Sequence, residues 1–481
     1  MASLGDLLSG VGAPDDAAVH VGVDTAVSRA DVEAAASRLG AALRDAGVRA
    51  GNAVAVSLPN GSDVVGALFG VWGTGAVYVP LNPRLTAGER EHILDAVRPA
   101  AVVTEGLVVE SCVDAVGYDD DIALISMTSG TTGRPKPVLL RHSGVLELID
   151  GVLGSLRGRG RGAANEGARA ERPMPNLVPV SLSLWAGIYQ VLFAFRVGAP
   201  VVILPSFEPR AFADAVAHHG IKSTVLPPAA MVMLSDDESI DSLAPLKYVR
   251  SISSPLSPLQ ARRFRDRFGI AVLNGWGQTE IGGEIVGWTA ADSREFGDAK
   301  LGAVGRPHQG VTIRVVDAAG DDVAADEPGE LWVMTPALSA GYADGADLSD
   351  RLSPDGWFRT GDVGRVDEDG FVWIEGRVSD MINRGGLKVF PAEVAEVLRL
   401  SPAVADAHVA GVADDRLGEV PWAFVIPETT SAPTDEELDR LCRAHLAPYK
   451  VPVRYVVVDE LPRNEIGKVL TSKLVEAAQA S

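Results

Sequence analysis

In the first half of the chain, apolar positions alternate between the spacing of a helix and that of a strand. From Ser28, which can cap a helix, to Gly47, which can end one, apolar residues recur on one helix face, and residues 53–58 then form an apolar run. The same order, a helical segment before a strand, recurs at 63–75 with 76–79 and at 211–219 with 223–226. This alternation predicts βα units around a largely parallel sheet.

The pattern changes from about residue 300 to residue 376. The segments VTIRVV, GELWVM and FVWIEG are separated by turns rich in glycine and aspartate. Short strands with such turns between them are typical of an antiparallel sheet. We therefore predict a β-rich subdomain here.

The last hundred or so residues have the composition of a small α/β domain. The expected elements are two helices, at 392–400 and 434–446, and three strands, at 408–412, 422–426 and 453–457. Segments of about a hundred residues commonly fold as independent domains. With the boundary at 377–380, the predicted domains are 1–378 and 379–481.

Composition and charge narrow the class of protein. The chain has 481 residues, of which 47% are hydrophobic and 22% charged, which favours a globular protein over a disordered one. Lys and Arg number 43 against 64 Asp and Glu, which gives a net charge of −21. Because so acidic a surface repels phosphate backbones, nucleic acid is not an expected partner.

Cysteine usage and hydropathy bear on the compartment. Cys112 and Cys442 lie far apart and match no disulfide framework or zinc-ligand spacing. The N-terminus has no signal-peptide pattern, and the most lipid-like run, 187–205, is interrupted by Arg196 and Pro200. We expect no membrane span and a cytoplasmic location.

The segment MTSGTTGRPKPV (127–138) follows an apolar strand and has the composition of a phosphate-binding loop. Its glycines let backbone N–H groups converge on an anion, its hydroxyls are further donors, and Lys136 supplies a positive charge. The spacing is not that of a Walker A motif. The alternative is a polar surface loop, but such a loop would rarely combine these residues directly after a strand.

This segment and four others resemble the AMP-forming acyl-CoA synthetases, which share a superfamily with nonribosomal adenylation domains and beetle luciferases. The four are GWGQTE (275–280), DGWFRTGD (355–362), GRVSDMINRGGLKVFPAEV (376–394) and LPRNEIGKVL (461–470). The resemblance spans nearly the whole chain. It implies an α/β fold with a large N-terminal domain, made of two doubly wound α/β subdomains and a β-rich one, and a small mobile C-terminal lid. It also implies ATP, Mg²⁺ and coenzyme A as cofactors.

The resemblance implies a role for particular residues in each motif. Those expected on the phosphates and the metal are Thr128, Ser129, Gly130, Thr131, Thr132, Lys136, Thr279, the metal ligand Glu280 and the catalytic Lys468. Those expected around adenine and ribose are Ser253, Ser254, Gly275, Trp276, Gly277, Asp362 and Arg377. Gly385, Gly386 and Lys388 would border the thiol tunnel, and Ser379 would be the hinge.

The chemistry of the reaction agrees with these roles. A carboxylate that attacks the α-phosphate of ATP brings two anions together, so the site needs a metal and a cation. Glu280 and Lys468 would supply them. Taken singly, each could be a surface residue, and Asp362 a turn former or Arg377 a surface cation. The occurrence of all the motifs in order favours the functional interpretation.

Several positions depart from the family pattern. Pro137 stands where glycine is usual, the sequence from Ile252 to Pro255 replaces a Gly-Gly-Ala-Pro wall, and Ser379 replaces the usual Asp or Lys. PVSLSLWAG (179–187) lacks a family histidine, and Thr471 replaces an arginine. Because Pro137 has no N–H, it could remove a phosphate donor.

These departures leave three hypotheses. The first is a complete acyl-CoA ligase. The second is an enzyme that performs only the thioester half-reaction, with acyl adenylate made by a partner. The third is a non-catalytic protein that binds nucleotide or acyl adenylate. Retention of Lys468 and Glu280 favours the first.

The acid itself is only partly constrained. No aspartate for an α-amine occurs near Leu182, which argues against a free amino acid. Trp185 and Ile281 favour an apolar acyl or alicyclic group, although both could simply be core residues. The expected acceptor is coenzyme A rather than a carrier-protein pantetheine. The arginines that could meet its 3′-phosphate, or form a solvated loop instead, are Arg157, Arg159 and Arg161.

Overall fold

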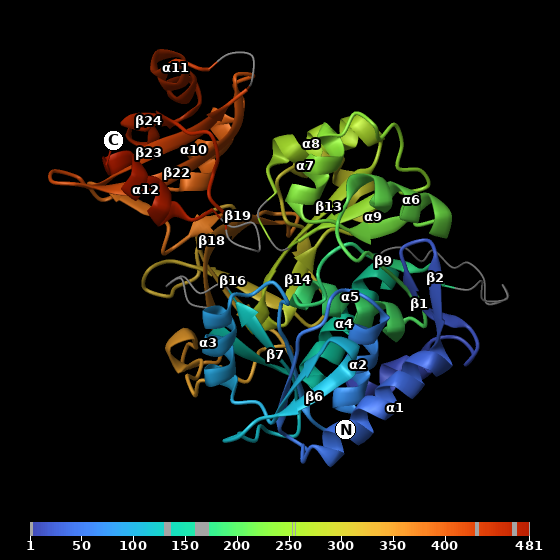
Figure 1. The fold of residues 1–481 in the computed structure, drawn as a ribbon. Coiled ribbons are helices and arrows are strands. Elements are labelled where there is room, and N and C mark those ends of the chain that lie inside the picture. Colours follow the sequence, from blue (N-terminus) through green and yellow to red (C-terminus); the bar gives the residue numbers. More distant parts are fainter. Residues whose placement is uncertain are drawn as a thin grey trace.

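The computed structural model describes residues 3–128, 136–158, 173–252, 254, 256–428, 432–463 and 469–480. These residues form five sheets flanked by helices, and the last sheet belongs to a unit at the C-terminal end that stands apart from the larger body (Figure 1). The expected α/β class is confirmed. Among the described residues, no helix combines the length and apolar character required to cross a membrane.

The first large sheet has a parallel centre and antiparallel edges. Its six strands, in spatial order, are β6 (Val108–Ser111), β5 (Ala101–Thr104), β3 (Ala53–Val56), β4 (Val77–Pro80), β7 (Ile122–Thr128) and β8 (Lys136–Arg141). β5, β3, β4 and β7 pair in parallel, whereas β6 and β8 pair with their neighbours in antiparallel fashion. The associated helices are α1 (Arg29–Asp45), α2 (Ser62–Trp72) and α3 (Ala87–Val97).

Two of these helices show how local sequence sets the packing. The Ser28 side chain accepts a hydrogen bond from the backbone of Asp31 and so caps α1 as expected. α2 is buried on all sides, and a Cβ at its Gly70 would lie 2.8 Å from the Ala36 carbonyl of α1. Glycine therefore allows the two helix backbones to approach closely.

Two further sheets complete the βα part of the chain. One has the order β2 (Thr25–Ser28), β1 (Ala17–Val21), β10 (Val201–Ile203) and β9 (Asn176–Val178); the other has β11 (Ser223–Val225), β12 (Tyr248–Ser251), β13 (Ala271–Gln278), β14 (Gly283–Gly287) and β15 (Arg306–Pro307). The helices of this part are α4 (His142–Gly158), α5 (Trp185–Arg196), α6 (Pro209–His219), α7 (Pro228–Asp236), α8 (Pro258–Phe268) and α9 (Ala290–Phe296).

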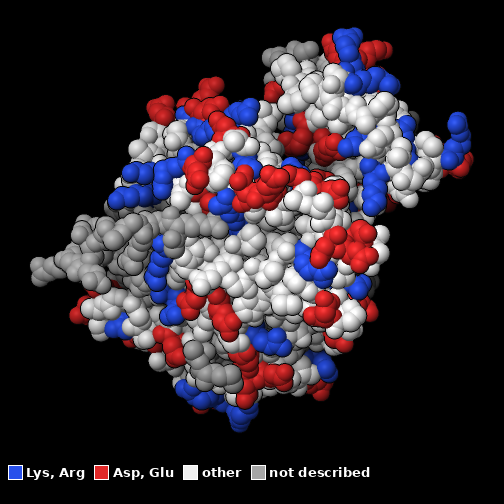
Figure 2. All heavy atoms as spheres, turned by 180° about the vertical axis from the view of Figure 1, so that it is seen from behind, with Lys and Arg blue, Asp and Glu red and all other residues white. Residues whose placement is uncertain are grey.

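The β-rich region forms one antiparallel sheet, as its sequence predicts. Its strands are β16 (Thr312–Val316), β17 (Gly329–Met334), β18 (Phe358–Val366) and β19 (Val372–Arg377). The short helix η5 (Ser349–Arg351) lies between the second and third of these strands. On the face shown in Figure 2, Lys and Arg side chains are interspersed with Asp and Glu side chains.

The C-terminal unit is built on β20 (Ile382–Arg384), β21 (Leu387–Val389), β22 (Val404–Asp414), β23 (Gly418–Pro427) and β24 (Arg454–Val457), with α10 (Pro391–Leu398), α11 (Asp435–His445) and α12 (Thr471–Ala480). All five predicted elements occur, with shifted ends. The β20–β21 hairpin is additional. Gly385 and Gly386, both with positive φ, form its two-residue turn.

The two parts of the chain meet around the start of α8. Ser257 caps that helix and donates a hydrogen bond of 2.9 Å from its hydroxyl to Glu396 on α10. The connecting segment between β19 and β20 contains Ser379, whose hydroxyl donates to the neighbouring Asp380. The Ser257–Glu396 hydrogen bond joins the two parts of the chain directly.

The C-terminal unit is expected to lose stability in mild acid through His408. This histidine on β22 contacts the Thr471 hydroxyl at 2.9 Å, and burial, with Arg399 adding to it, lowers its pKa from 6.5 to about 4. The unfolded chain therefore binds more protons between these values, so stability falls as pH falls through that window, by about 3 kcal/mol at most. Urea unfolding of wild type and His408→Asn should show a steeper pH slope for wild type. Identical slopes would contradict this account.

Candidate active site

The motif GWGQTE (275–280), called the nucleotide motif below, begins on β13 at the point where this strand changes partners. The first half of β13 pairs in parallel with β12, and the segment from Gly275 to Gln278 pairs in antiparallel fashion with β14. A Cβ at Gly277 would lie 1.7 Å from the Gly283 carbonyl, so no side chain fits there. The glycines of this motif are therefore required by the close approach of the two strands.

Asp362 on β18 is the acceptor around which the expected ribose site is arranged. It is 4% exposed. One carboxylate oxygen accepts hydrogen bonds from the Trp276 indole at 2.8 Å and from the Gln278 amide at 2.9 Å. The other lies 2.9 Å from the Arg377 guanidinium. The structure thus brings three predicted residues, Trp276, Asp362 and Arg377, together from distant parts of the sequence.

Glu280 lies at the other end of the same motif, in the short helix η3 (Thr279–Ile281). One of its oxygens accepts from the Tyr342 hydroxyl at 3.3 Å and from the Arg351 guanidinium at 3.2 Å. Burial, with the charge of Glu280 adding to it, raises the pKa of Tyr342, so the phenol remains protonated and able to donate. The Lys136 ammonium lies 5.4 Å from the centre of the Tyr342 ring. Lys136 and Glu280 are therefore neighbours across one tyrosine.

Arg351 joins the ribose and metal parts of the site and was not predicted from the sequence. Besides Glu280, it donates to the Gln278 side chain at 3.2 Å and to the Thr360 carbonyl at 2.8 Å. Gln278 in turn donates to Asp362. A continuous chain of hydrogen bonds therefore connects the two carboxylates. No periodic pattern marks Arg351, because it follows a loop that only the fold brings to β13.

The phosphate segment is partly described. Thr128 ends β7 and Lys136 begins β8, where the two residues pair, and the Thr128 hydroxyl donates to the Lys136 carbonyl at 3.4 Å. The predicted donors between them, Ser129, Gly130, Thr131 and Thr132, lie outside the described residues. The expected loop thus begins and ends on adjacent strands.

Pro137 follows Lys136 in the sequence, which suggests a place beside the phosphates, but the structure places it within β8. It is a strand residue opposite Met127, and its carbonyl accepts from the Ala343 backbone at 2.8 Å. Because the N and C=O of a strand residue point to the same side, a donor restored at position 137 would point toward residues 341–343. The interpretation that Pro137 removes a phosphate donor is therefore not supported.

Pro137→Gly should leave the rate of pyrophosphate exchange unchanged within about threefold and lower stability by about 1 kcal/mol, because glycine adds conformational freedom to the unfolded chain. Isotope exchange and urea unfolding would measure the two effects. A tenfold or larger rise in exchange would show that residue 137 limits phosphate binding after all.

The residues expected beside the acyl group are buried together. The Trp185 indole at the start of α5 donates to the Gly282 carbonyl at 2.8 Å, and Ile281 is fully buried in the same hydrophobic cluster. Ser254 lies between β12 and α8, whereas Ser253 is outside the described residues. Core packing and substrate contact are both compatible with the positions of Trp185 and Ile281.

The residues expected on the thiol side lie on the C-terminal unit. Lys388 is exposed on β21, and the Gly385 and Gly386 amides donate to the Leu417 carbonyl and the Asn383 side chain. These contacts are all within that unit. Lys468, Arg159 and Arg161 lie outside the described residues, and Arg157 is exposed near the end of α4.

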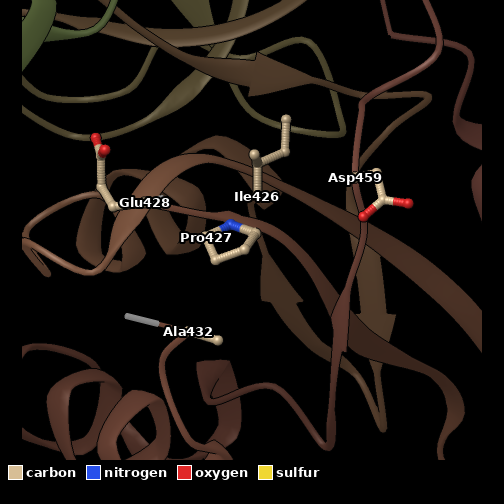
Figure 3. A pocket seen from close by; sticks show the side chains of 5 residues that line it. All are labelled: Ile426, Pro427, Glu428, Ala432 and Asp459. Atoms are coloured by element: carbon tan, nitrogen blue, oxygen red, sulfur yellow. The ribbon is translucent and has the colours of Figure 1, made fainter. Parts of the chain in front are cut away.

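One cavity is lined by none of the predicted site residues that the structure describes. It is on the C-terminal unit and is lined by Ile426, Pro427, Glu428, Ala432 and Asp459 (Figure 3). Two of these five side chains are carboxylates, which would repel phosphate or a carboxylic acid. In the described part of the chain, no group of three or more His, Cys, Asp or Glu side chains is arranged to hold a metal.

Comparison with known proteins assigns the chain to a family. Residues 9–119 and 110–343 match the sequence model of the AMP-binding enzyme family. Residues 393–468 match the model of the C-terminal domain of these enzymes. The chain belongs to the AMP-binding enzyme family. The adenylate-forming superfamily indicated by the sequence motifs is thereby confirmed.

Individual members of the AMP-binding enzyme family are similar over nearly their full length. The feruloyl-CoA synthase of Amycolatopsis sp. is 31% identical, with 94% of each chain covered, and the indoleacetate–CoA ligase of Aromatoleum aromaticum is 30% identical over 92% of this chain and 91% of that one. The o-succinylbenzoate CoA synthetase of Bacillus subtilis, solved with its acyl-adenylate intermediate, superimposes with a TM-score of 0.84 at 25% identity, covering 98% of both chains. The same enzyme has been solved with ATP and magnesium.

Proposed function

We propose that the protein activates a non-amino-acid carboxylic acid with ATP to form acyl-AMP and then transfers the acyl group to coenzyme A. The observation that carries this proposal is the hydrogen-bonded chain from Asp362 through Gln278 and Arg351 to Glu280, with Lys136 beside it. It brings together an acceptor for ribose on β18, a carboxylate for a metal on η3 and a cation for phosphate on β8. The relatives named as CoA ligases support the same class of reaction.

ATP would lie along β13 with its ribose at Asp362. The buried Asp362 carboxylate already accepts hydrogen bonds from an indole and an amide and pairs with a guanidinium. These contacts hold it in one orientation before the ligand arrives. The Trp276 ring is fixed by the same hydrogen bond and would lie against adenine. Nucleotide binding would thus use groups that are largely preorganised.

Glu280 fits a magnesium ion that enters with ATP. Mg²⁺ is commonly bound by one or two carboxylates together with substrate phosphates, rather than by a cage of protein ligands. Glu280 is such a single carboxylate, and its side chain is 13% exposed. When bound, the ion would neutralise charge on the phosphates. Tyr342 and Arg351 would keep the carboxylate oriented.

In the first half-reaction a carboxylate oxygen of the acid attacks the α-phosphorus, the new O–P bond forms, and the bond to pyrophosphate breaks. Lys136 and Lys468 would offset the negative charge that builds up. In the second, the coenzyme A sulfur attacks the acyl carbon and AMP leaves with the oxygen that came from the acid. The thiol proton passes to solvent or to the departing phosphate.

Two reactions at one site require two arrangements of the C-terminal unit. We propose that residues 379–481 form a lid that turns about Ser379, presenting Lys468 for adenylation and the Gly385–Lys388 hairpin for thiol transfer. The exposed hairpin and the small Ser257–Glu396 contact at the junction support such a movement.

The proposed acid has an apolar acyl or alicyclic body that contacts Trp185 and Ile281. Coenzyme A is proposed as the acceptor rather than a carrier-protein pantetheine, because the feruloyl-CoA synthase and the indoleacetate–CoA ligase, each at least 30% identical, are named for coenzyme A. We also propose a cytoplasmic location, because the two cysteines match no disulfide framework.

A panel of acids tests the proposal. The purified protein would be incubated with ATP, Mg²⁺, coenzyme A and each acid, and then with preformed acyl adenylates and coenzyme A. Acyl-CoA formation from free acids supports the complete ligase. Formation from adenylates alone would establish the thioester-only alternative, and absence of both reactions would favour a binding protein.

A further inference from the structure

A buried cluster of charged and polar side chains lies behind the nucleotide motif and has no part in the mechanism above. Glu284 on β14 accepts hydrogen bonds from Arg250 on β12 and, at 3.2 Å, from His308. Arg250 also donates to the Trp288 carbonyl at 3.0 Å. The side chains of Glu284 and His308 are 5% and 1% exposed.

The cluster adjoins the proposed acyl site. A Cβ at Gly275 would lie 2.9 Å from the Glu284 carboxyl carbon, so the carboxylate rests directly on the strand that carries Trp276. Tyr189 is one helical turn beyond Trp185 on α5, and the two rings meet edge to face at 5.7 Å. Glu284 therefore lies against the strand that carries Trp276, and Tyr189 contacts an expected acyl residue.

Two polar atoms of this region are buried and lack a hydrogen-bond partner within the described residues: the Tyr189 hydroxyl and Nδ1 of His308. Because Nε2 of His308 faces Glu284, Nδ1 is the ring nitrogen left without a partner. Buried groups of this kind are costly unless something completes their hydrogen bonds. Burial raises the pKa of Tyr189, and Glu284 adds to the shift, so the phenol is a donor at neutral pH.

We propose that this cluster recognises an uncharged hydrogen-bonding group, such as a hydroxyl, at the end of the acyl chain remote from the reacting carboxylate. The proposal rests on the proposed function and specifies its substrate class. The acid would have an apolar body, with one polar group directed toward Tyr189 and His308.

The charges of the cluster argue for a neutral group. Burial alone would raise the pKa of Glu284, but the Arg250 guanidinium and the His308 hydrogen bond outweigh it and hold the pKa below its usual value. Glu284 is thus ionised and already paired with Arg250. A second carboxylate on the substrate would be repelled by Glu284, and Arg250 could not compensate because it already pairs with Glu284. A plain hydrocarbon would leave the Tyr189 hydroxyl and Nδ1 of His308 without partners.

The test measures binding without turnover. The probes are sulfamoyl-adenosine analogues of three acyl adenylates, made from phenylpropanoic acid and from its para-hydroxy and para-carboxy derivatives. Calorimetry should show the wild type binding the hydroxy analogue at least about tenfold more tightly than either other analogue. Tyr189→Phe should reduce this preference by about three- to tenfold, and its unfolding midpoint should not fall, because the hydroxyl it removes is unsatisfied.

Tyr118→Phe is the matched control, since its hydroxyl donates to the Val97 carbonyl at 2.8 Å far from the cluster. It should lower stability and leave the preference intact. Equal affinities for the hydroxy and plain analogues, tighter binding of the carboxy analogue, or no binding of any would each overturn the inference. Acyl-CoA formation tests the proposed function separately, so failure of this inference can be distinguished from failure of the proposed function.

Discussion

Lys468→Ala should lower the rate of acyl-adenylate formation by about a hundred- to a thousandfold, the size of effect seen when a donor to transition-state charge is removed. Transfer of the acyl group from supplied acyl adenylate to coenzyme A should remain within a fewfold of wild type. The reason is that the lysine charge is needed only while pyrophosphate leaves. Pyrophosphate exchange and thioester formation would be measured separately.

Lys473→Ala is a suitable control, because Lys473 is an exposed residue of α12 close to Lys468 in sequence. It should leave both half-reactions unchanged. An equal loss of both half-reactions in Lys468→Ala would mean that the lysine has a structural role and that the proposed lid movement is wrong.

Asp362→Asn should weaken binding of ATP and of acyl adenylate alike, by about ten- to a hundredfold, because both present the same ribose hydroxyls and each charge-assisted hydrogen bond is worth about 1.5–3 kcal/mol. The substitution also removes the partner of Arg377. Calorimetric titration with ATP and with a stable adenylate analogue would measure the change.

Asp367→Asn separates binding from stability. Asp367 is also buried and accepts from a tryptophan indole, that of Trp373 at 3.0 Å, and from Lys300 at 2.9 Å. Its substitution should destabilise the protein without changing nucleotide affinity. If Asp362→Asn binds ATP as wild type does, Asp362 is not in the nucleotide site.

The sequence motifs anticipated the nucleotide half of the site better than its surroundings. Trp276 and Asp362 each belong to a recognisable motif, and in the structure a hydrogen bond joins them. Arg351 and Tyr342 carry no such signal, because they reach Glu280 only through the loops between β17 and β18. The hairpin turn at Gly385 and Gly386 was not predicted, although two consecutive glycines between short segments favour such a turn.

The features that the sequence did not predict depend on contacts between distant segments. The predicted strand 53–58 ends at Val56, because strand ends depend on neighbouring strands that a single segment does not reveal. The direction of the Pro137 backbone could not be predicted, because it depends on the pairing of β8. The Arg250–Glu284–His308 cluster combines residues from three separate segments, so no spacing in the sequence indicates it.

The most direct test of the central claim follows an oxygen atom from the acid. The panel acid that gives the fastest acyl-CoA formation would be labelled with a heavy oxygen isotope in both carboxylate positions and incubated with ATP, Mg²⁺ and coenzyme A. Attack of the carboxylate on the α-phosphorus, followed by cleavage of the acyl C–O bond, places one labelled oxygen in every AMP formed. Mass spectrometry of AMP should show that single label. Acyl-CoA formed together with unlabelled AMP, or with the label in inorganic phosphate, would contradict the acyl-adenylate mechanism.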